Sequence, residues 1–351
     1  GGFYERPPVG AGGHFVTSPH VHAIFAELLL RALRDLGEAL GRPEPLPLVE
    51  VGAGDGTLAA ALLRLADELG PPLAYAAVER SPGAREALAR LPVRVIERLD
   101  QLDPLDPGVL LANELLDNLP FRRVRMTAGG LVEVRVGVGP DRLIEVEVPC
   151  EPELASRVPS LPAGEETAVP EAALAFVDHA ARRIRRGYAL LIDYGSGEGR
   201  PGEVHGYREH RVVEDVLLDP GSADVTAGVD LGAIVGRARA AGLEVVGPVT
   251  QARALRALGF DRWSELQRER QAEASRGPAA RSEAVRIWQG RTRAGLLVDP
   301  AGLGRLRWLL LATPGLPAPP WMREPEAGSD GPRPSSDRPA AQGGDTVRHG
   351  S

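Results

Sequence analysis

Residues 49–58 of the chain read Val49-Glu50-Val51-Gly52-Ala53-Gly54-Asp55-Gly56-Thr57-Leu58. A short apolar segment ends at Val51 and predicts a buried strand, and a helical pattern runs from Thr57 to about Leu69. Glycine has no Cβ atom, so the turn between strand and helix can be tight and a ligand can approach its backbone. The exposed N–H groups at the start of the helix favour an anionic group, here a carboxylate.

The spacing of these glycines separates two classes of cofactor fold. Dinucleotide-binding folds carry G-x-G-x-x-G or A, whereas this loop is G-x-G-x-G followed by Thr57. Glu50, an acid two residues before the first glycine, is typical of S-adenosylmethionine (SAM) methyltransferases. Glu79 ends the next predicted strand, about 20 residues beyond the loop, where such folds hold ribose hydroxyls. The alternative for Glu79 is a solvated residue before a helix start. The residues expected to bind SAM are Glu50, Gly52, Gly54, Gly56, Thr57, Glu79, Arg80 and, from a later segment, Asn113.

Strand-like and helix-like segments alternate on both sides of the loop. Strands are expected at residues 48–51, 74–78, 93–96, 109–111, 188–192, 243–246 and 307–311, and helices at 21–40, 57–69, 82–90 and 171–186. This order predicts a doubly wound α/β fold, a parallel sheet covered by helices on both faces. Between Phe121 and Val148 the pattern changes to an alternation of apolar and polar residues, as in Val132-Glu133-Val134-Arg135-Val136, which predicts an antiparallel β insertion beside the main sheet.

The chain divides into three segments. Residues 1–47 are expected to form an irregular N-terminal arm and a helix, and residues 48–323 the cofactor-binding domain, with its β insertion at about 121–150. Pro, Gly, Ser, Asp and Arg dominate residues 324–351, which predicts a disordered tail.

Composition narrows the classes of function. The net charge is −7, so a nucleic-acid partner is not expected. All 41 basic residues are arginine, which excludes a P-loop lysine and a Schiff-base lysine. The single cysteine, Cys150, fits a reducing compartment, and neither a membrane span nor a signal peptide is recognisable. We therefore expect a cytoplasmic protein without a membrane partner, and leave its oligomeric state open.

Taken together, the motifs resemble those of the MidA-like methyltransferases, over nearly all of residues 1–315. The matching segments are Gly2-Phe3-Tyr4, Gly13-His14-Phe15-Val16-Thr17-Ser18-Pro19, the loop with Glu50 and Glu79, Ala112-Asn113-Glu114-Leu115-Leu116-Asp117-Asn118-Leu119-Pro120, Ile192-Asp193-Tyr194-Gly195, Gly206-Tyr207-Arg208-Glu209-His210 and Asp224-Val225-Thr226-Ala227-Gly228-Val229-Asp230. His14 and His20 depart from the pattern, since the family often has acids there. The best-known member, a mitochondrial complex I assembly factor, methylates an arginine. The resemblance thus implies a SAM-dependent protein arginine N-methyltransferase with a protein substrate.

Asn113, Glu114 and Asp117 follow a predicted strand, at the sheet edge where doubly wound folds bind ligands. A guanidinium is a poor nucleophile, and a carboxylate that accepts from two of its N–H groups would orient it. We expect Glu114 in that role, Asp117 as a second acid or proton acceptor, and Asn113 as a positioning group. The only asparagines of the chain, Asn113 and Asn118, both lie here. The alternative is a solvated helix start with its cap.

The histidines of the arm and two later polar segments are weaker candidates for functional roles. His20 and His22 have a spacing that metal ligands can show, but a third ligand is lacking nearby, so we expect an exposed arm and no metal. The segments 206–210 and 224–230 are expected to be loops after the fifth strand, where substrates enter.

Two alternative functions remain open: methyl transfer to another acceptor, and a non-catalytic assembly factor that keeps the SAM fold.

Removing the residues from about Ala327 onward should leave the melting temperature and the affinity for SAM unchanged. The tail lacks the apolar surface that a packed segment needs. Thermal unfolding and titration calorimetry of the shortened chain check this, and a clear loss of either quantity would mean that the tail packs on the domain.

Overall fold

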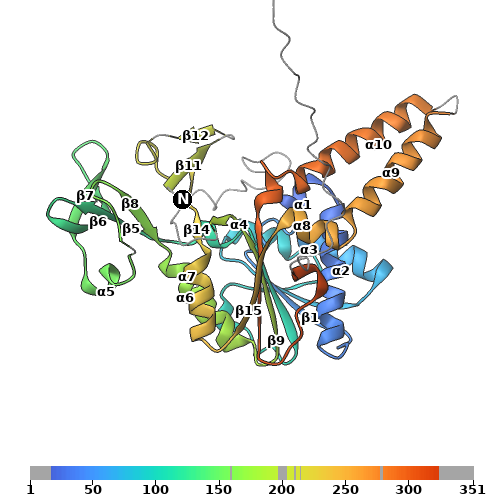
Figure 1. The fold of residues 1–351 in the computed structure, drawn as a ribbon, viewed down its shortest axis with the longest axis horizontal. Coiled ribbons are helices and arrows are strands. Elements are labelled where there is room, and N and C mark those ends of the chain that lie inside the picture. Colours follow the sequence, from blue (N-terminus) through green and yellow to red (C-terminus); the bar gives the residue numbers. More distant parts are fainter. Residues whose placement is uncertain are drawn as a thin grey trace, which may run out of the picture.

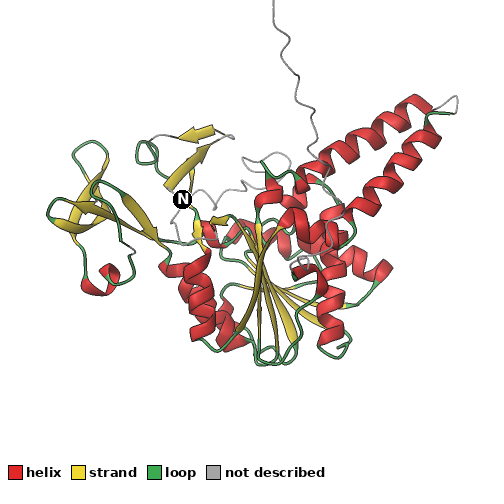
Figure 2. Ribbon diagram, viewed as in Figure 1, coloured by secondary structure: helices red, strands yellow, loops and turns green. Residues whose placement is uncertain are grey.

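The structure is a computed structural model, which describes residues 17–158, 160–196, 204–208, 211–213, 215–276 and 280–323. Its helices are α1 Ser18–Val21, α2 Ile24–Ala39, α3 Thr57–Leu69, α4 Pro82–Leu88, α5 Pro152–Ala155, α6 Glu171–Arg183, α7 Leu231–Ala240, α8 Gln251–Ala257, α9 Phe260–Ala274 and α10 Ala280–Gly295. The strands of the main sheet are β1 Leu46–Val51, β2 Leu73–Val78, β3 Arg94–Ile96, β4 Gly108–Asn113, β9 Gly187–Asp193, β15 Glu244–Thr250 and β16 Arg307–Ala312. Figures 1 and 2 show this sheet at the centre of the molecule.

The main sheet has seven strands in the order β15-β16-β9-β4-β1-β2-β3. The pairs from β3 to β9 are parallel, as expected, but β16 runs antiparallel to both β9 and β15. A wholly parallel sheet was therefore the wrong expectation for its last strand. The reason lies in the connection: β15 ends at Thr250, which pairs with Arg307 at the start of β16, so the chain re-enters the sheet at the edge where it left.

Helices cover both faces of the sheet, which confirms the doubly wound class. On one face α2, α3 and α8 pack against alternate strand residues, including Leu48, Leu190 and Trp308. On the other, α6 and α7 pack against the intervening residues, such as Leu110 and Leu191. Because both faces are buried, β4 and β9 are apolar rather than alternating up to their last residues, Asn113 and Asp193. These two apolar layers hold the strand ends, and thus the site, in place.

The insertion is larger than the alternation predicted. It is a four-stranded antiparallel sheet in the order β7-β6-β5-β8, formed by β5 Arg122–Thr127, β6 Gly130–Val138, β7 Leu143–Pro149 and β8 Glu166–Val169. The predicted end near residue 150 was wrong, because β8 pairs with β5 after the short helix α5. Four residues at Glu166–Val169 are too few to show an alternation in the sequence.

The segments predicted as loops contain short β-strands. β11 Val204–Arg208 and β13 Asp224–Ala227, which overlap the predicted loop segments, pair with each other, and β12 Arg211–Val213 pairs with β11. β14 Val229–Asp230 pairs with β10 Gly195–Ser196.

The helices α9 and α10, which the sequence analysis did not predict, form an antiparallel hairpin that projects from the body, as Figure 1 shows. Its apolar residues are sparse, so the sequence lacks a clear helical stripe there.

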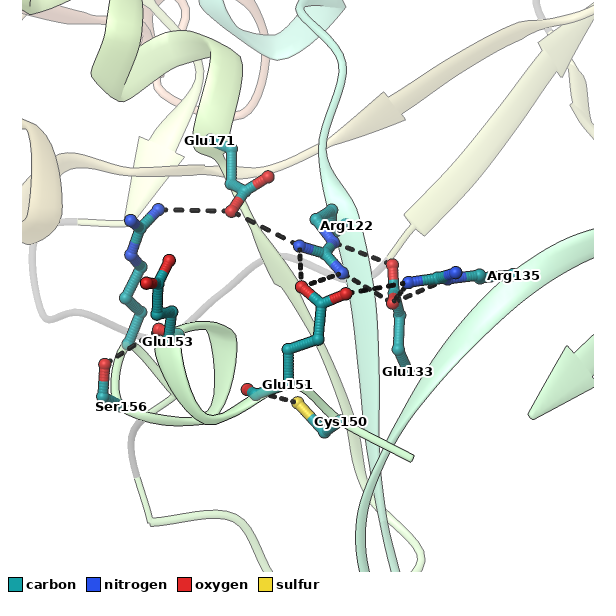
Figure 3. Close-up of polar contacts among 9 residues, drawn as sticks. Arg122, Glu133, Arg135, Cys150, Glu151, Glu153, Ser156 and Glu171 are labelled. Carbon is teal, nitrogen blue, oxygen red and sulfur yellow. Dashed lines mark hydrogen bonds and ion pairs between the residues drawn. The ribbon is translucent and has the colours of Figure 1, made fainter. Parts of the chain in front are cut away.

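An ion-pair cluster holds the base of the insertion, as Figure 3 shows. Arg122 donates from Nε to Glu133 Oε1 at 2.8 Å and from Nη2 to Oε2 at 2.6 Å, and Arg135 Nε donates to Glu133 Oε2 at 2.7 Å. Arg122 also lies 3.3 Å from Glu151 and 3.8 Å from Glu171 at the start of α6. The cluster therefore ties the insertion sheet to the helix that leads back into the main sheet. The side chain of Glu133 is only 7% exposed.

Substituting Glu133→Gln should lower the free energy of unfolding by about 2 kcal/mol at neutral pH, because a charged, two-pronged hydrogen bond is lost. The Arg122 guanidinium lowers the pKa of Glu133 from 4.5 to about 2, which outweighs the effect of burial. Its stabilising contribution is thus complete above about pH 5 and is lost as the pH falls towards 2.

Denaturant unfolding of both chains across this pH range tests the prediction. The difference between them should shrink at acid pH. Glu151→Gln is the matched control, since this carboxylate faces the same arginine but is 59% exposed, and should cost less. A pH-independent difference would contradict the prediction.

Candidate functional site

The candidate site lies at the carboxyl edge of the main sheet, where four strands end together. Val51 at the end of β1 pairs with both Val78 of β2 and Ala112 of β4, and Asn113 of β4 pairs with Ile192 of β9. This register brings the glycine loop, Glu79 and the segment from Asn113 to Asn118 to one edge. The predicted grouping of these residues is therefore what the parallel pairing produces.

All three glycines of the loop have positive φ, at +75° for Gly52, +55° for Gly54 and +81° for Gly56. Their surroundings differ. A Cβ atom at Gly52 would lie 2.8 Å from Leu115 Cδ1, and one at Gly56 would lie 3.0 Å from side chains of Leu88 and Leu91. A Cβ at Gly54 would meet no atom within 4 Å. Gly52 and Gly56 thus let the protein pack closely around the loop, whereas Gly54 borders open space that a ligand can use.

Glu79 is bound to the glycine loop. Its Oε2 accepts from the N–H of Gly54 at 2.9 Å, and its Oε1 accepts from the N–H of Ser81 at 2.8 Å. Each oxygen has a second lone pair, so both remain able to accept from a ligand hydroxyl. Arg80 beside it is exposed, and Thr57 begins α3 with its N–H donating to Asp55 Oδ1 at 3.0 Å.

Glu50 lies behind the loop rather than in front of it. It is 3% exposed and accepts from the Tyr75 hydroxyl at 2.6 Å. Burial raises the pKa of Glu50 from 4.5 to about 8, with Glu79 and Asp55 adding to the shift. The hydrogen bond between Glu50 and Tyr75 joins β1 to β2 behind the loop.

Asn113 provides a further test of the fit to an adenosyl cofactor. Its Nδ2 donates to Glu114 Oε1 at 3.3 Å, but its Oδ1 is buried and has no hydrogen-bond partner among the described residues. A buried acceptor without a partner is costly unless a ligand or water donates to it. A bound polar molecule that donates to this atom would satisfy it, and Gly54 leaves room for a ligand at the loop, so the residues present fit an adenosyl cofactor.

Glu114 occupies a strained position. Its φ is +51°, which is uncommon for a residue other than glycine and clusters at functional sites. Its Oε1 accepts from the N–H of Ser18 at 3.0 Å. Burial raises the pKa of Glu114, and the hydrogen bonds from Ser18 and Asn113 oppose the shift only in part. A cation next to this carboxylate would compensate for its burial.

Two further acids, Asp117 and Asp193, belong to or contact the turn that follows Glu114. Asp117 is in the 3₁₀ turn Leu116–Asn118 and accepts from Asn118 Nδ2 at 2.9 Å. Asp193, 2% exposed at the end of β9, accepts from the N–H groups of Leu116 at 2.6 Å and Tyr194 at 2.8 Å. Burial, with Glu114 nearby, raises the pKa of Asp193 to about 7. Asp193 thus anchors the turn that carries Asp117.

The two histidines of the arm do not behave as predicted. His20 is not exposed: its side chain is 8% accessible, and its Nε2 lies 3.1 Å from Asp55 Oδ2 in the glycine loop. His22 is half-buried and packs edge-on against Trp263 with ring centroids 5.1 Å apart. In the part of the chain that the structure describes, metal-binding clusters of three or more His, Cys, Asp or Glu are absent. The exposed-arm prediction failed because tertiary packing brings α1 onto the loop.

The remaining motif residues are divided between structural roles and undescribed positions. Asp230 caps α7 by accepting from the N–H of Ala233 at 2.9 Å. Gly228 and Val229 line a small cavity together with Asp117, which brings the segment 224–230 next to the candidate acids. Residues 2–4, 13–16, 209 and 210 of the motifs, and the tail from 324, lie outside the described residues. No described helix is long and apolar enough to span a membrane.

Comparisons with known proteins point to one family. A family model described as "Putative S-adenosyl-L-methionine-dependent methyltransferase" matches residues 28–249. The mitochondrial protein arginine methyltransferase NDUFAF7 of Danio rerio is 28% identical over 342 residues, which cover 86% of this chain and 77% of the relative. The same protein of Xenopus tropicalis is 32% identical over 301 residues, which cover 74% of this chain and 69% of the relative.

A solved structure agrees with these relatives. A protein from Burkholderia thailandensis, bound to S-adenosyl-homocysteine, superposes with a TM-score of 0.74 at 28% identity, covering 88% of this chain and 80% of the other. Both the fold and a ligand of the adenosyl type are therefore found among the proteins to which this chain is similar.

Substituting Gly54→Val should weaken binding of S-adenosyl-homocysteine by about 100-fold or more. The branched side chain would be strained at positive φ and would fill the space beside the loop. Titration calorimetry measures this, with NAD as a ligand that should not bind. Gly242→Val is the matched control, because Gly242 also has positive φ and open surroundings but lies after α7. Equal affinity in the Gly54 variant and the parent chain would contradict this assignment of the loop.

Proposed function

Because the chain belongs to the MidA-like family of SAM-dependent methyltransferases, we propose that it transfers a methyl group to an arginine side chain of a protein. Its curated relatives are named protein arginine methyltransferases, which supports this acceptor. The observation that carries the proposal is Glu114, a carboxylate held in a strained conformation beside the cofactor loop.

The role of Glu114 follows from the chemistry of the acceptor. The lone pairs of a guanidinium are delocalised, so its nitrogens attack poorly. A carboxylate that accepts from two guanidinium N–H groups orients the acceptor and concentrates electron density on the third nitrogen. Burial disfavours the ionised form of Glu114 and raises its pKa, so a positively charged acceptor beside the carboxylate would offset that cost where a neutral one would not.

The cofactor supplies a methyl group on a sulfonium, which makes that methyl electrophilic. The residues that would hold it are the glycine loop, Glu79 for the ribose hydroxyls and Asn113 through its unpartnered Oδ1. Most of the rate enhancement would come from holding the acceptor nitrogen close and in line. The close contact between Gly52 and Leu115 keeps the loop and the acid-bearing segment in one relative position.

Transfer of the methyl group from the sulfonium to a protonated guanidinium would add a second positive charge to the acceptor, so one proton must leave its attacking nitrogen. We propose Asp117 as the group that accepts this proton, or as a second acid that orients the guanidinium, since it lies three residues from Glu114 in the turn that follows β4. Asp193 is the alternative: it is more deeply buried, and its pKa of about 7 suits a proton acceptor near neutral pH. Its two backbone hydrogen bonds favour an anchoring role.

Two other functions remain candidates and are distinguishable by experiment. The same site could methylate a small molecule or another protein side chain, because fold does not determine acceptor. A non-catalytic assembly role would leave SAM binding intact and methyl transfer undetectable.

The cytoplasmic location expected from the composition stays a prediction, and the curated relatives are named mitochondrial.

Substituting Glu114→Gln should lower methyl transfer by about 100-fold, the scale for losing one preorganised electrostatic partner. Cofactor affinity should persist, because the loop and Glu79 are untouched. The assay is transfer of labelled methyl from SAM to proteins, followed by mass spectrometry of modified arginines. Asp117→Asn is the companion variant and should cost less.

Transfer at the parental rate by the Glu114 variant would refute its role and direct attention to Asp193. A parent chain that binds SAM yet methylates nothing in a complete proteome would favour the assembly role instead.

A further inference from the structure

The short helix α1 contacts both halves of the site. From its first residue, the N–H of Ser18 donates to Glu114 Oε1 at 3.0 Å. From its third residue, His20 Nε2 lies 3.1 Å from Asp55 Oδ2 in the glycine loop. Glu114 and Asp55 belong to segments that follow different strands, so α1 is a bridge between them.

The imidazole of His20 is fixed from both sides. Its Nδ1 lies 2.8 Å from Thr17 Oγ1 and its Nε2 contacts Asp55, so both ring nitrogens are engaged. The His20 carbonyl accepts from Arg293 Nη2 of α10 at 3.0 Å. Because the side chain is 8% exposed, few other rotamers are open to it. His20 is thus a preorganised partner for the loop.

Asp55 receives two hydrogen bonds in this arrangement. Burial by itself would raise the pKa of Asp55, but the hydrogen bonds from His20 and from Thr57 outweigh it and lower the pKa. Asp55 Oδ1 accepts from the Thr57 N–H at the start of α3, and Oδ2 faces His20. The carboxylate therefore holds the loop between the helix that follows it and α1. It directly adjoins Gly54, whose surroundings are open.

Buried hydrogen bonds to α8 fix the position of α1. Ser18 is fully buried, and its Oγ donates to Gln251 Oε1 at 3.4 Å. Gln251 is itself fully buried, and its Nε2 donates to the carbonyls of Leu297 and Leu303, both at 3.1 Å. The position of α1 is thus set by the core beneath it, and this position is transmitted to the loop through His20.

We propose that α1 is a clamp on the cofactor loop and that His20 is a positioning residue, which acts on SAM through Asp55. A loop held in its binding conformation before the ligand arrives loses less freedom on binding, so affinity rises. This role concerns the cofactor and does not depend on which group accepts the methyl. It also gives His20 a function at a position where the family often has an acid.

The test is a double-mutant cycle with shape-conserving variants. His20→Leu removes the hydrogen bond at similar volume, and Asp55→Asn removes the charge but keeps an acceptor for Thr57. Each should weaken binding of S-adenosyl-homocysteine by about tenfold, the scale for one hydrogen bond to a charged group. The double variant should lose no more than either single variant, because both remove the same interaction. Titration calorimetry provides the affinities.

Three further variants distinguish positioning from general support. His20→Gln keeps a donor and should retain affinity to within about threefold. The exchanged chain, His20→Asp with Asp55→His, should recover part of the loss. Arg64→Ala is the matched control, since it breaks an exposed ion pair with Glu68 on α3 and should change nothing.

The clamp is refuted if His20→Leu folds, as judged by its melting temperature without ligand, and binds as tightly as the parent. Fully additive losses in the double variant would refute it too. If His20→Leu does not fold, His20→Gln and the exchanged chain decide the question. The proposal would be overturned if both bound S-adenosyl-homocysteine as weakly as the Asp55→Asn variant. A lack of arginine methylation leaves these binding measurements unaffected, so failure of the proposed function is recognised separately.

Discussion

The parallel pairing of β1 with β2 on one side and β4 on the other is the constraint on which the rest of the site depends. Because these strands run the same way in a common register, the segments that follow them all leave the sheet at one edge. Two buried apolar layers hold the register, since a shift by one residue would exchange the faces of every strand. The cofactor loop, Glu79 and Glu114 can therefore come from distant parts of the sequence and still form one surface.

Close packing then fixes how these segments lie relative to each other. Gly52 leaves no room for a side chain because Leu115, next to Glu114, lies against it. The same residue pair places a strained backbone at Glu114 directly beside the loop. Asp193 fixes the segment after Glu114 by accepting from the N–H of Leu116. α1 contacts both segments, since Ser18 donates to Glu114 and His20 contacts Asp55 of the loop. Strain at one residue is thus maintained by contacts from several elements.

The absence of lysine shapes the electrostatics of the whole chain. Arg122 with Glu133, and Arg123 with Glu166, form two-pronged pairs that an ammonium group cannot make. These pairs give the insertion sheet a rigid base although its apolar core consists of few residues.

The sequence by itself determined the order along the chain of the seven main-sheet strands and of helices α2, α3, α4 and α6, the glycine loop from Gly52 to Gly56, and the grouping of Asn113, Glu114 and Asp117 at one edge. Apolar runs, glycine spacing and strand ends are local features, which a sequence displays directly. Tertiary structure decided the antiparallel direction of β16, the pairing of β8 with β5, and the contacts of His20. Each of these depends on partners far along the chain: Arg307 with Thr250, Val169 with Arg122, and His20 with Asp55. A histidine between a proline and a valine reads as an exposed turn, and only the packing of α1 on the loop made it part of the site.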